Sequence, residues 1–148
     1  MIRLATADDE DAILGMAREF AAFTPYKDLV VATDDELRTV IRWFVDNATI
    51  FISDDAGKAV GMLFAILSPV WYAPRFKMAT EIAWWVAPSH RGGSRAVRLV
   101  REFESWARSN GAVIVNMSNL QMENASQVAG VLKKLGYSLS EQTHSKRI

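Results

Sequence analysis

Hydrophobic residues recur at intervals of three and four positions in the first third of the chain, which is the spacing of an amphipathic helix. The first such helix follows a cap at Thr6 and ends before Pro25. Its apolar positions are Ile13, Met16, Ala17, Phe20 and Ala21. The second begins at a capping box over residues 33–36 and ends near Asn47. Its apolar positions are Leu37, Val40, Ile41, Phe44 and Val45.

Two further helices are predicted in the second half of the chain. One extends from Ala96 to about Ser109, and its inward residues are Val97, Val100, Phe103 and Ala107. The other begins at Asn124, continues through Lys134 and is closed by Gly136.

Short runs rich in β-branched and aromatic residues lie between these helices and predict strands. The predicted strands are residues 2–5, 49–53, 59–67, 78–86 and 112–117, with one or two more within 137–147. Residues 54–58 predict a hairpin turn and residues 68–77 a loop of the length that often carries function. The element order predicts an α+β fold with a partly antiparallel sheet.

Composition narrows the class of protein. The chain has 148 residues, no cysteine and a formal net charge of zero, and half of its residues are hydrophobic. We therefore expect one folded domain over residues 1–148, without disulfides or thiolate metal sites. A neutral charge argues against a general nucleic-acid binder. No signal peptide and no apolar run of about 20 residues is present, so we expect a cytoplasmic protein with no membrane partner.

The segment from Val86 to Ala96 is where candidate chemistry concentrates. It follows the apolar strand 81–86, contains Gly92 and Gly93, and opens the third helix. A loop of this kind directs backbone N–H groups to the positive end of a helix dipole, where phosphate binds. The cations in and after this loop are His90, Arg91, Arg95, Arg98 and Arg101, and all precede the first acid, Glu102. The alternative is a simple turn followed by a solvated helix face.

The pattern Val86-x-Pro88-x-x-Arg91-Gly92-x-x-x-Ala96 resembles the acyl-CoA signature of the GNAT N-acetyltransferase superfamily. That signature has glutamine or arginine, two residues, glycine, one residue, then glycine or alanine. Ser94 takes the place of the usual central glycine, and Gly93 comes one position early. The resemblance implies a GNAT-like fold, with a central, mostly antiparallel sheet of six to seven strands flanked by four helices.

The same resemblance implies acetyl-CoA as the acyl donor and assigns residues to it. The backbone of Arg91, Gly92, Gly93, Ser94, Arg95 and Ala96 would hold the CoA pyrophosphate. The backbones of Trp84, Trp85 and Val86 would pair with the pantetheine arm. Asn124 resembles the asparagine that the family places near this arm, and the alternative for it is a plain helix cap.

Glu81 is the candidate catalytic residue. It lies five residues before Val86 in an apolar strand, where some family members carry a glutamate that acts as general base. Partial burial would raise its pKa toward neutrality. The alternative is a solvated carboxylate paired with Arg75 or Lys77. Leu132 occupies the position of the family's tyrosine acid, and Tyr137 resembles a structural aromatic of the same motif.

These observations predict an acetyl-CoA-dependent N-acetyltransferase that acts on a primary amine of a small molecule or a protein. The alternatives are a CoA-binding module of the same fold with little turnover, and a phosphate-binding domain of another class. We expect no metal site. The sequence leaves open whether the protein forms a homodimer. The sequence does not identify the acceptor amine.

Overall fold

The computed structural model describes residues 1–148, which form two compact units, 1–118 and 119–148. The elements of the first unit are β1 (Ile2–Leu4), η1 (Ala7–Asp9), α1 (Glu10–Phe23), α2 (Asp34–Asn47), β2 (Thr49–Asp55), β3 (Lys58–Val70), β4 (Ala73–Val86), η2 (Pro88–His90), α3 (Arg95–Ser109) and β5 (Ala112–Asn116). The second unit contains α4 (Ala125–Lys134). None of these helices has the length and apolar character that crossing a membrane requires.

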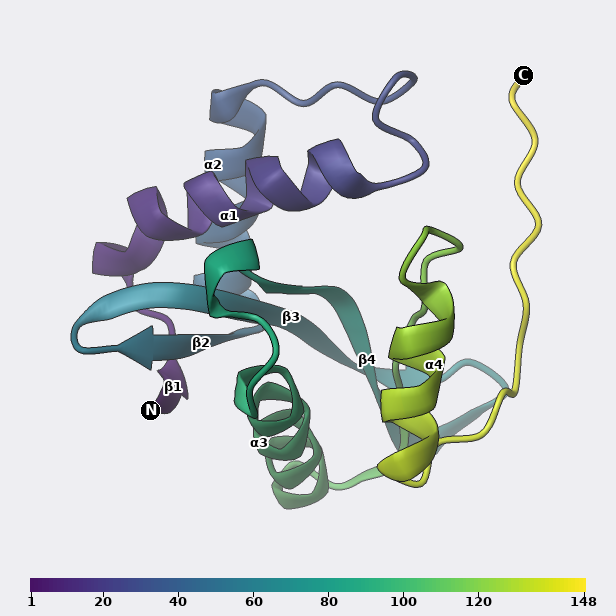
Figure 1. Ribbon diagram of the computed structural model, residues 1–148. Helices are drawn as coiled ribbons and strands as arrows, with labels where there is room; N and C mark the ends of the chain where they lie inside the picture. The colour runs from purple at the N-terminus through teal and green to yellow at the C-terminus, as the bar shows by residue number, and fades with distance from the viewer. The chain divides into compact units, whose positions relative to one another are not determined.

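The first unit is built on a five-stranded sheet with the order β1-β2-β3-β4-β5. All neighbouring strands are antiparallel except β4 and β5, which are parallel. Helices α1 and α2 cover one face of this sheet, and α3 covers the other (Figure 1). The α+β class and the mixed sheet are therefore as predicted.

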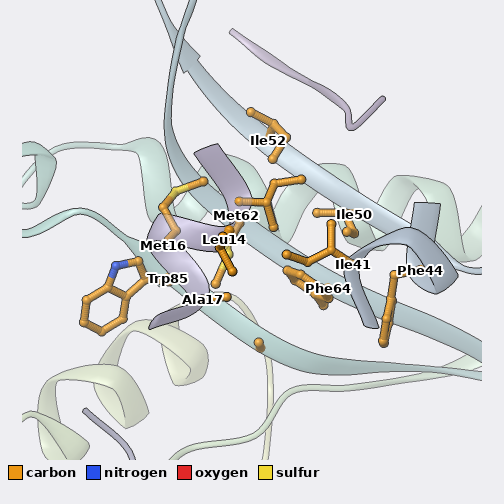
Figure 2. Close-up of a cluster of buried hydrophobic side chains, with 12 residues drawn as sticks. Leu14, Met16, Ala17, Ile41, Phe44, Ile50, Ile52, Met62, Phe64 and Trp85 are labelled. Carbon is orange, nitrogen blue, oxygen red and sulfur yellow. The ribbon is translucent and has the colours of Figure 1, made fainter. Parts of the chain in front are cut away.

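The hydrophobic core beneath α1 and α2 explains why these helices form where the periodicity places them. Apolar residues of both helices pack on alternate residues of β2, β3 and β4, which point to the same face of the sheet (Figure 2). Ile13, Ile41 and Ile52 are almost completely buried there. Trp85 contributes the β4 side of this core and reaches the end of α1.

Local capping chemistry sets the starts of α2 and of η1, the short helix that leads into α1. Thr33 and Glu36 form the predicted capping box, with Thr33 N–H donating to the Glu36 carboxylate at 2.7 Å. The predicted cap at Thr6 precedes the short helix η1 instead of α1 itself. Asp9 accepts from the Thr6 backbone N–H at 2.9 Å and from Arg3 at 2.7 Å, so η1 is fastened to β1.

The structure corrects the prediction of a loop over residues 68–77. β3 continues to Val70 and β4 begins at Ala73, so only Trp71 and Tyr72 form the turn of a long hairpin. The two prolines of the segment suggested a loop, but Pro69 lies next to a register irregularity, where a missing N–H is tolerated.

The structure also corrects the expected number of strands, which is five where six to seven were predicted. Residues 137–148 form no strand. This segment is mostly polar, and its aliphatic residues Leu139 and Ile148 are both exposed. It therefore lacks the alternating buried face that stabilises a strand by packing.

Candidate active site

The site is centred on the place where β4 and β5 separate. β5 pairs with β4 only from Lys77 to Thr80, whereas β3 pairs with β4 up to Val86. Residues 81–86 of β4 therefore have a strand neighbour on one edge only. A strand edge without a neighbour presents backbone N–H and C=O groups that an extended ligand can use.

A β-bulge at Ile82 determines which way the site residues point. Phe64 lies opposite Ala83, and the next residue of β3, Ala65, lies opposite Glu81, so Ile82 is the extra residue. Cross-strand partners share a face of the sheet. The bulge consequently places Glu81 on the face that carries α3, whereas Ala83 stays on the face that carries α1 and α2.

Glu81 is buried at this fork, with 4% of its surface exposed. Its carboxylate accepts a hydrogen bond from the Ser118 backbone N–H at 2.9 Å, just beyond the end of β5. Burial raises the pKa of Glu81 from 4.5 to about 7, and the Ser118 N–H offsets only part of this effect. A carboxyl group with this pKa is both an acceptor and a donor of protons near neutral pH.

The alternative ion pairs predicted for Glu81 are absent. Arg75 places its guanidinium over the Phe76 ring, 4.5 Å from the centroid. Lys77 donates to the Asn110 carbonyl at 3.4 Å. Neither cation neutralises Glu81, so the interpretation of a solvated, paired carboxylate is wrong.

The glycine loop leads from β4 through η2 into α3. Gly92 has φ = 84°, a conformation that glycine adopts without strain, and it turns the chain toward the helix. The first helical backbone bond of α3 runs from Arg98 N–H to the Ser94 carbonyl. The N–H groups of residues 92–97 donate to no backbone carbonyl. Six consecutive donors at the positive end of a helix form a site suited to an anion.

Arg91 fastens the start of this loop to the end of β4. Its Nε donates to the Val86 carbonyl at 2.8 Å, and its guanidinium lies 4.3 Å from the centroid of Trp85. The Trp85 indole N–H in turn donates to Glu19 of α1 at 3.0 Å. The ring also contacts Phe23, with centroids 5.5 Å apart. The Arg91 side chain therefore joins the loop to the end of β4 and, through Trp85, to α1. The motif alone did not show this connection.

Asp55 fastens the other end of the loop and was not identified from the sequence. Its carboxylate pairs with Arg95 at 2.7 Å and lies 3.6 Å from His90 Nε2. The hydrogen bond from Arg95 lowers the pKa of Asp55 below its usual value. The adjacent acids at 54 and 55 indicated only a hairpin turn, because a pairing across 40 residues leaves no local pattern.

Two predicted residues belong to the second unit. Asn124 occupies the N-cap position of α4, but its side chain makes no capping hydrogen bond. The Asn119 side chain instead donates to the Ala125 carbonyl at 2.9 Å. Leu132 is 8% exposed, and its carbonyl accepts from the Tyr137 backbone N–H at 3.0 Å. The cap position predicted for Asn124 is confirmed, while its role toward a cofactor stays a prediction.

The raised pKa of Glu81 predicts that the folded protein loses stability as the pH rises. The contribution of the protonated group is fully present below pH 4.5 and is lost as the pH rises through about 7. Glu81→Gln removes the titration and keeps the shape. Urea unfolding at pH 5 and pH 8 should show the wild type losing roughly 2–3 kcal/mol relative to Glu81→Gln. Parallel pH dependence of the two proteins would show that Glu81 is not buried as described.

Solved structures share this architecture. A ribosomal-protein-alanine N-acetyltransferase from Brucella melitensis biovar Abortus 2308 aligns with a TM-score of 0.80 at 13% identity, over 100% of this chain and 98% of that one. The aminoglycoside N-acetyltransferase AAC(6')-Iy in complex with CoA aligns with a TM-score of 0.78 at 17% identity, over 100% and 93%. An acetyltransferase from Trypanosoma brucei gives 0.75 at 16%, over 100% and 99%. Identities this low establish similarity of fold alone.

No curated protein sequence is significantly similar to this chain. The sequence model of the acetyltransferase (GNAT) family, however, matches residues 13–137. This match includes the strand with Glu81, the glycine loop and α3. Because it extends over most of the 148 residues, the chain belongs to the acetyltransferase (GNAT) family.

Proposed function

We propose that the protein is an N-acetyltransferase that transfers the acetyl group of acetyl-CoA to a primary amine. The observation that carries the proposal is the position of Glu81 at the separation of β4 and β5, buried and with its pKa raised to about 7. Membership of the GNAT family supports acyl transfer in general. The donor, the acceptor class and the residue roles below are parts of the proposal.

The residues present fit acetyl-CoA. The six N–H groups of residues 92–97 and the dipole of α3 would hold the negative pyrophosphate. Arg95 would contribute through its backbone, since its side chain is paired with Asp55. The open edge of residues 84–86 would pair with the amide groups of the pantetheine arm. The acetyl group would then lie toward Glu81.

Glu81 would act as the general base. An alkylamine with a pKa near 10.4 is neutral in only about one molecule in a thousand near pH 7.4, so an acceptor of its proton accelerates the reaction. The amine nitrogen attacks the thioester carbonyl, a C–N bond forms, the C–S bond breaks, and the nitrogen loses its proton to Glu81. Backbone N–H groups of the open β4 edge would stabilise the negative charge on the carbonyl oxygen during attack.

The leaving thiolate would take its proton from water. Leu132 stands where family members carry a tyrosine acid, and a leucine cannot donate a proton. A thiol with a pKa near 8.5 leaves with little assistance, so this substitution is compatible with turnover. The same substitution, together with Ser94 in the loop, favours the second candidate function: a CoA-binding module that turns over slowly. Release of free thiol from acetyl-CoA in the presence of amines separates the two.

The acceptor would be an amine, because two of the similar structures are N-acetyltransferases, one for a ribosomal-protein alanine and one for aminoglycosides. The names of these two enzymes give acceptors as different as a ribosomal protein and an aminoglycoside. We therefore propose the class of amine acceptors without assigning one of them.

Binding of acetyl-CoA should stabilise the folded protein. At 100 times Kd a ligand adds about 2.7 kcal/mol, which raises Tm by roughly 5–11 °C in a domain of this size. Gly93→Pro should abolish the rise because it removes one loop N–H. Gly93→Ala is the matched control: it keeps the N–H, and an added Cβ meets no atom within 4 Å. Differential scanning fluorimetry measures all three, and an unchanged wild-type Tm at millimolar acetyl-CoA would refute cofactor binding.

Glu81→Gln should lower kcat/KM by roughly 100-fold or more at pH 7, since the amide cannot accept the proton. Activity should recover in part at high pH, where the amine deprotonates by itself, and the Kd for CoA should be nearly unchanged. Arg75→Gln is the control, because Arg75 contacts Phe76 and not Glu81. A wild-type rate for Glu81→Gln in the thiol-release assay would remove Glu81 from the mechanism.

A further inference from the structure

Two adjacent tryptophans of β4 point to opposite faces of the sheet, and only one of them has a hydrogen-bond acceptor for its indole N–H. Trp85 lies opposite Met62 in the core beneath α1 and α2, and its indole N–H donates to Glu19 at 3.0 Å. Trp84 lies opposite Leu63, on the other face. Its indole nitrogen is buried, yet it has no hydrogen-bond acceptor.

The face that carries Trp84 is the one that carries α3. Leu63 pairs on its other side with Phe51, whose ring contacts Phe103 of α3 with centroids 6.4 Å apart. Because cross-strand partners share a face, Trp84 lies on the same side of the sheet as α3. The loop that would bind an anion opens this helix. Glu81 lies on this face as well, through its pairing with Ala65.

Buried donors without an acceptor are rare in proteins, and each needs an explanation. In residues 1–118 two buried side-chain atoms have this property: Trp84 Nε1 and Arg95 Nε. The Arg95 guanidinium already pairs with Asp55 through Nη2, whereas Nε1 is the only polar atom of the Trp84 side chain. Trp84 is therefore the side chain that lacks any partner within the protein. An N–H group needs an acceptor, and a carbonyl oxygen of a ligand would supply it.

The position of Trp84 along the strand narrows the choice of acceptor. It lies three residues after Glu81, about 10 Å along an extended strand, and two residues before Val86, to which the loop is fastened. A ligand that follows the unpaired edge of β4 from the loop N–H groups to Glu81 passes Trp84. In CoA the part between the pyrophosphate and the thioester is the pantetheine arm, whose acceptors are amide carbonyl oxygens.

We propose that the Trp84 indole N–H donates to an amide carbonyl of the pantetheine arm and so positions the acyl group at Glu81. The proposal rests on the function proposed above and adds a side chain to an interaction expected of backbone groups. Trp84 is thereby a residue that recognises the arm of the donor, while the loop recognises its phosphates.

The test compares two ligands by isothermal titration calorimetry: CoA, and ADP, which carries the pyrophosphate without the arm. Trp84→Phe should raise the Kd for CoA roughly three- to tenfold, the range for loss of one neutral hydrogen bond, and leave the Kd for ADP within about twofold. Trp71→Phe is the matched control at the exposed hairpin turn and should change neither value. Equal CoA affinity of Trp84→Phe and wild type overturns the proposal, and so does equal weakening toward both ligands.

A second measurement keeps the test decisive if Trp84→Phe folds poorly. The chain has five tryptophans, so the wild type gives five indole N–H signals in an ¹⁵N–¹H spectrum, and those of Trp43, Trp71, Trp85 and Trp106 can be assigned from single Phe variants. The remaining signal, from Trp84, should move downfield with CoA and stay in place with ADP. A stationary signal at saturating CoA overturns this proposal alone, whereas a wild type that binds no CoA overturns the proposed function as well.

Discussion

The separation of β4 from β5 after Thr80 is the constraint on which the site depends. A sheet that continued to pair would satisfy the backbone of residues 81–86 within the protein and leave nothing for a ligand. Since β5 ends at Asn116, no strand pairs with this edge of β4 after Thr80, and two residues further on the Ser118 N–H donates to Glu81. The same break in pairing therefore exposes a strand edge and positions the buried acid.

The loop beyond β4 is held at both of its ends. Arg91 joins it to the Val86 carbonyl and the Trp85 ring, and Arg95 joins it to Asp55. These contacts neutralise or occupy the side chains of two arginines that a motif-based interpretation would assign to phosphate. What they leave available is the row of backbone N–H groups, fixed in orientation before any ligand binds. A preformed donor array costs little ordering entropy on binding.

The sequence was sufficient to predict the helices, the first strands and the glycine loop, because each has a local signal in periodicity, capping or turn residues. It also placed Glu81 on a strand before that loop. It could not predict the bulge at Ile82, since a one-residue register shift depends on the partner strand. The pairs Glu19–Trp85 and Asp55–Arg95 were missed because contacts between residues far apart in the chain leave no local pattern. The Glu81 side chain was also predicted to be less buried than it is.

If the backbone amides of residues 92–97 hold the phosphates of CoA and the unpaired edge of β4 receives its arm, both segments should respond when ¹⁵N-labelled protein is titrated with CoA. We expect saturable amide shifts that are largest at the loop amides and at residues 84–86, with smaller ones in β1 and β2. Saturable binding whose shifts avoid the loop, or no binding at millimolar CoA, would contradict this placement of CoA.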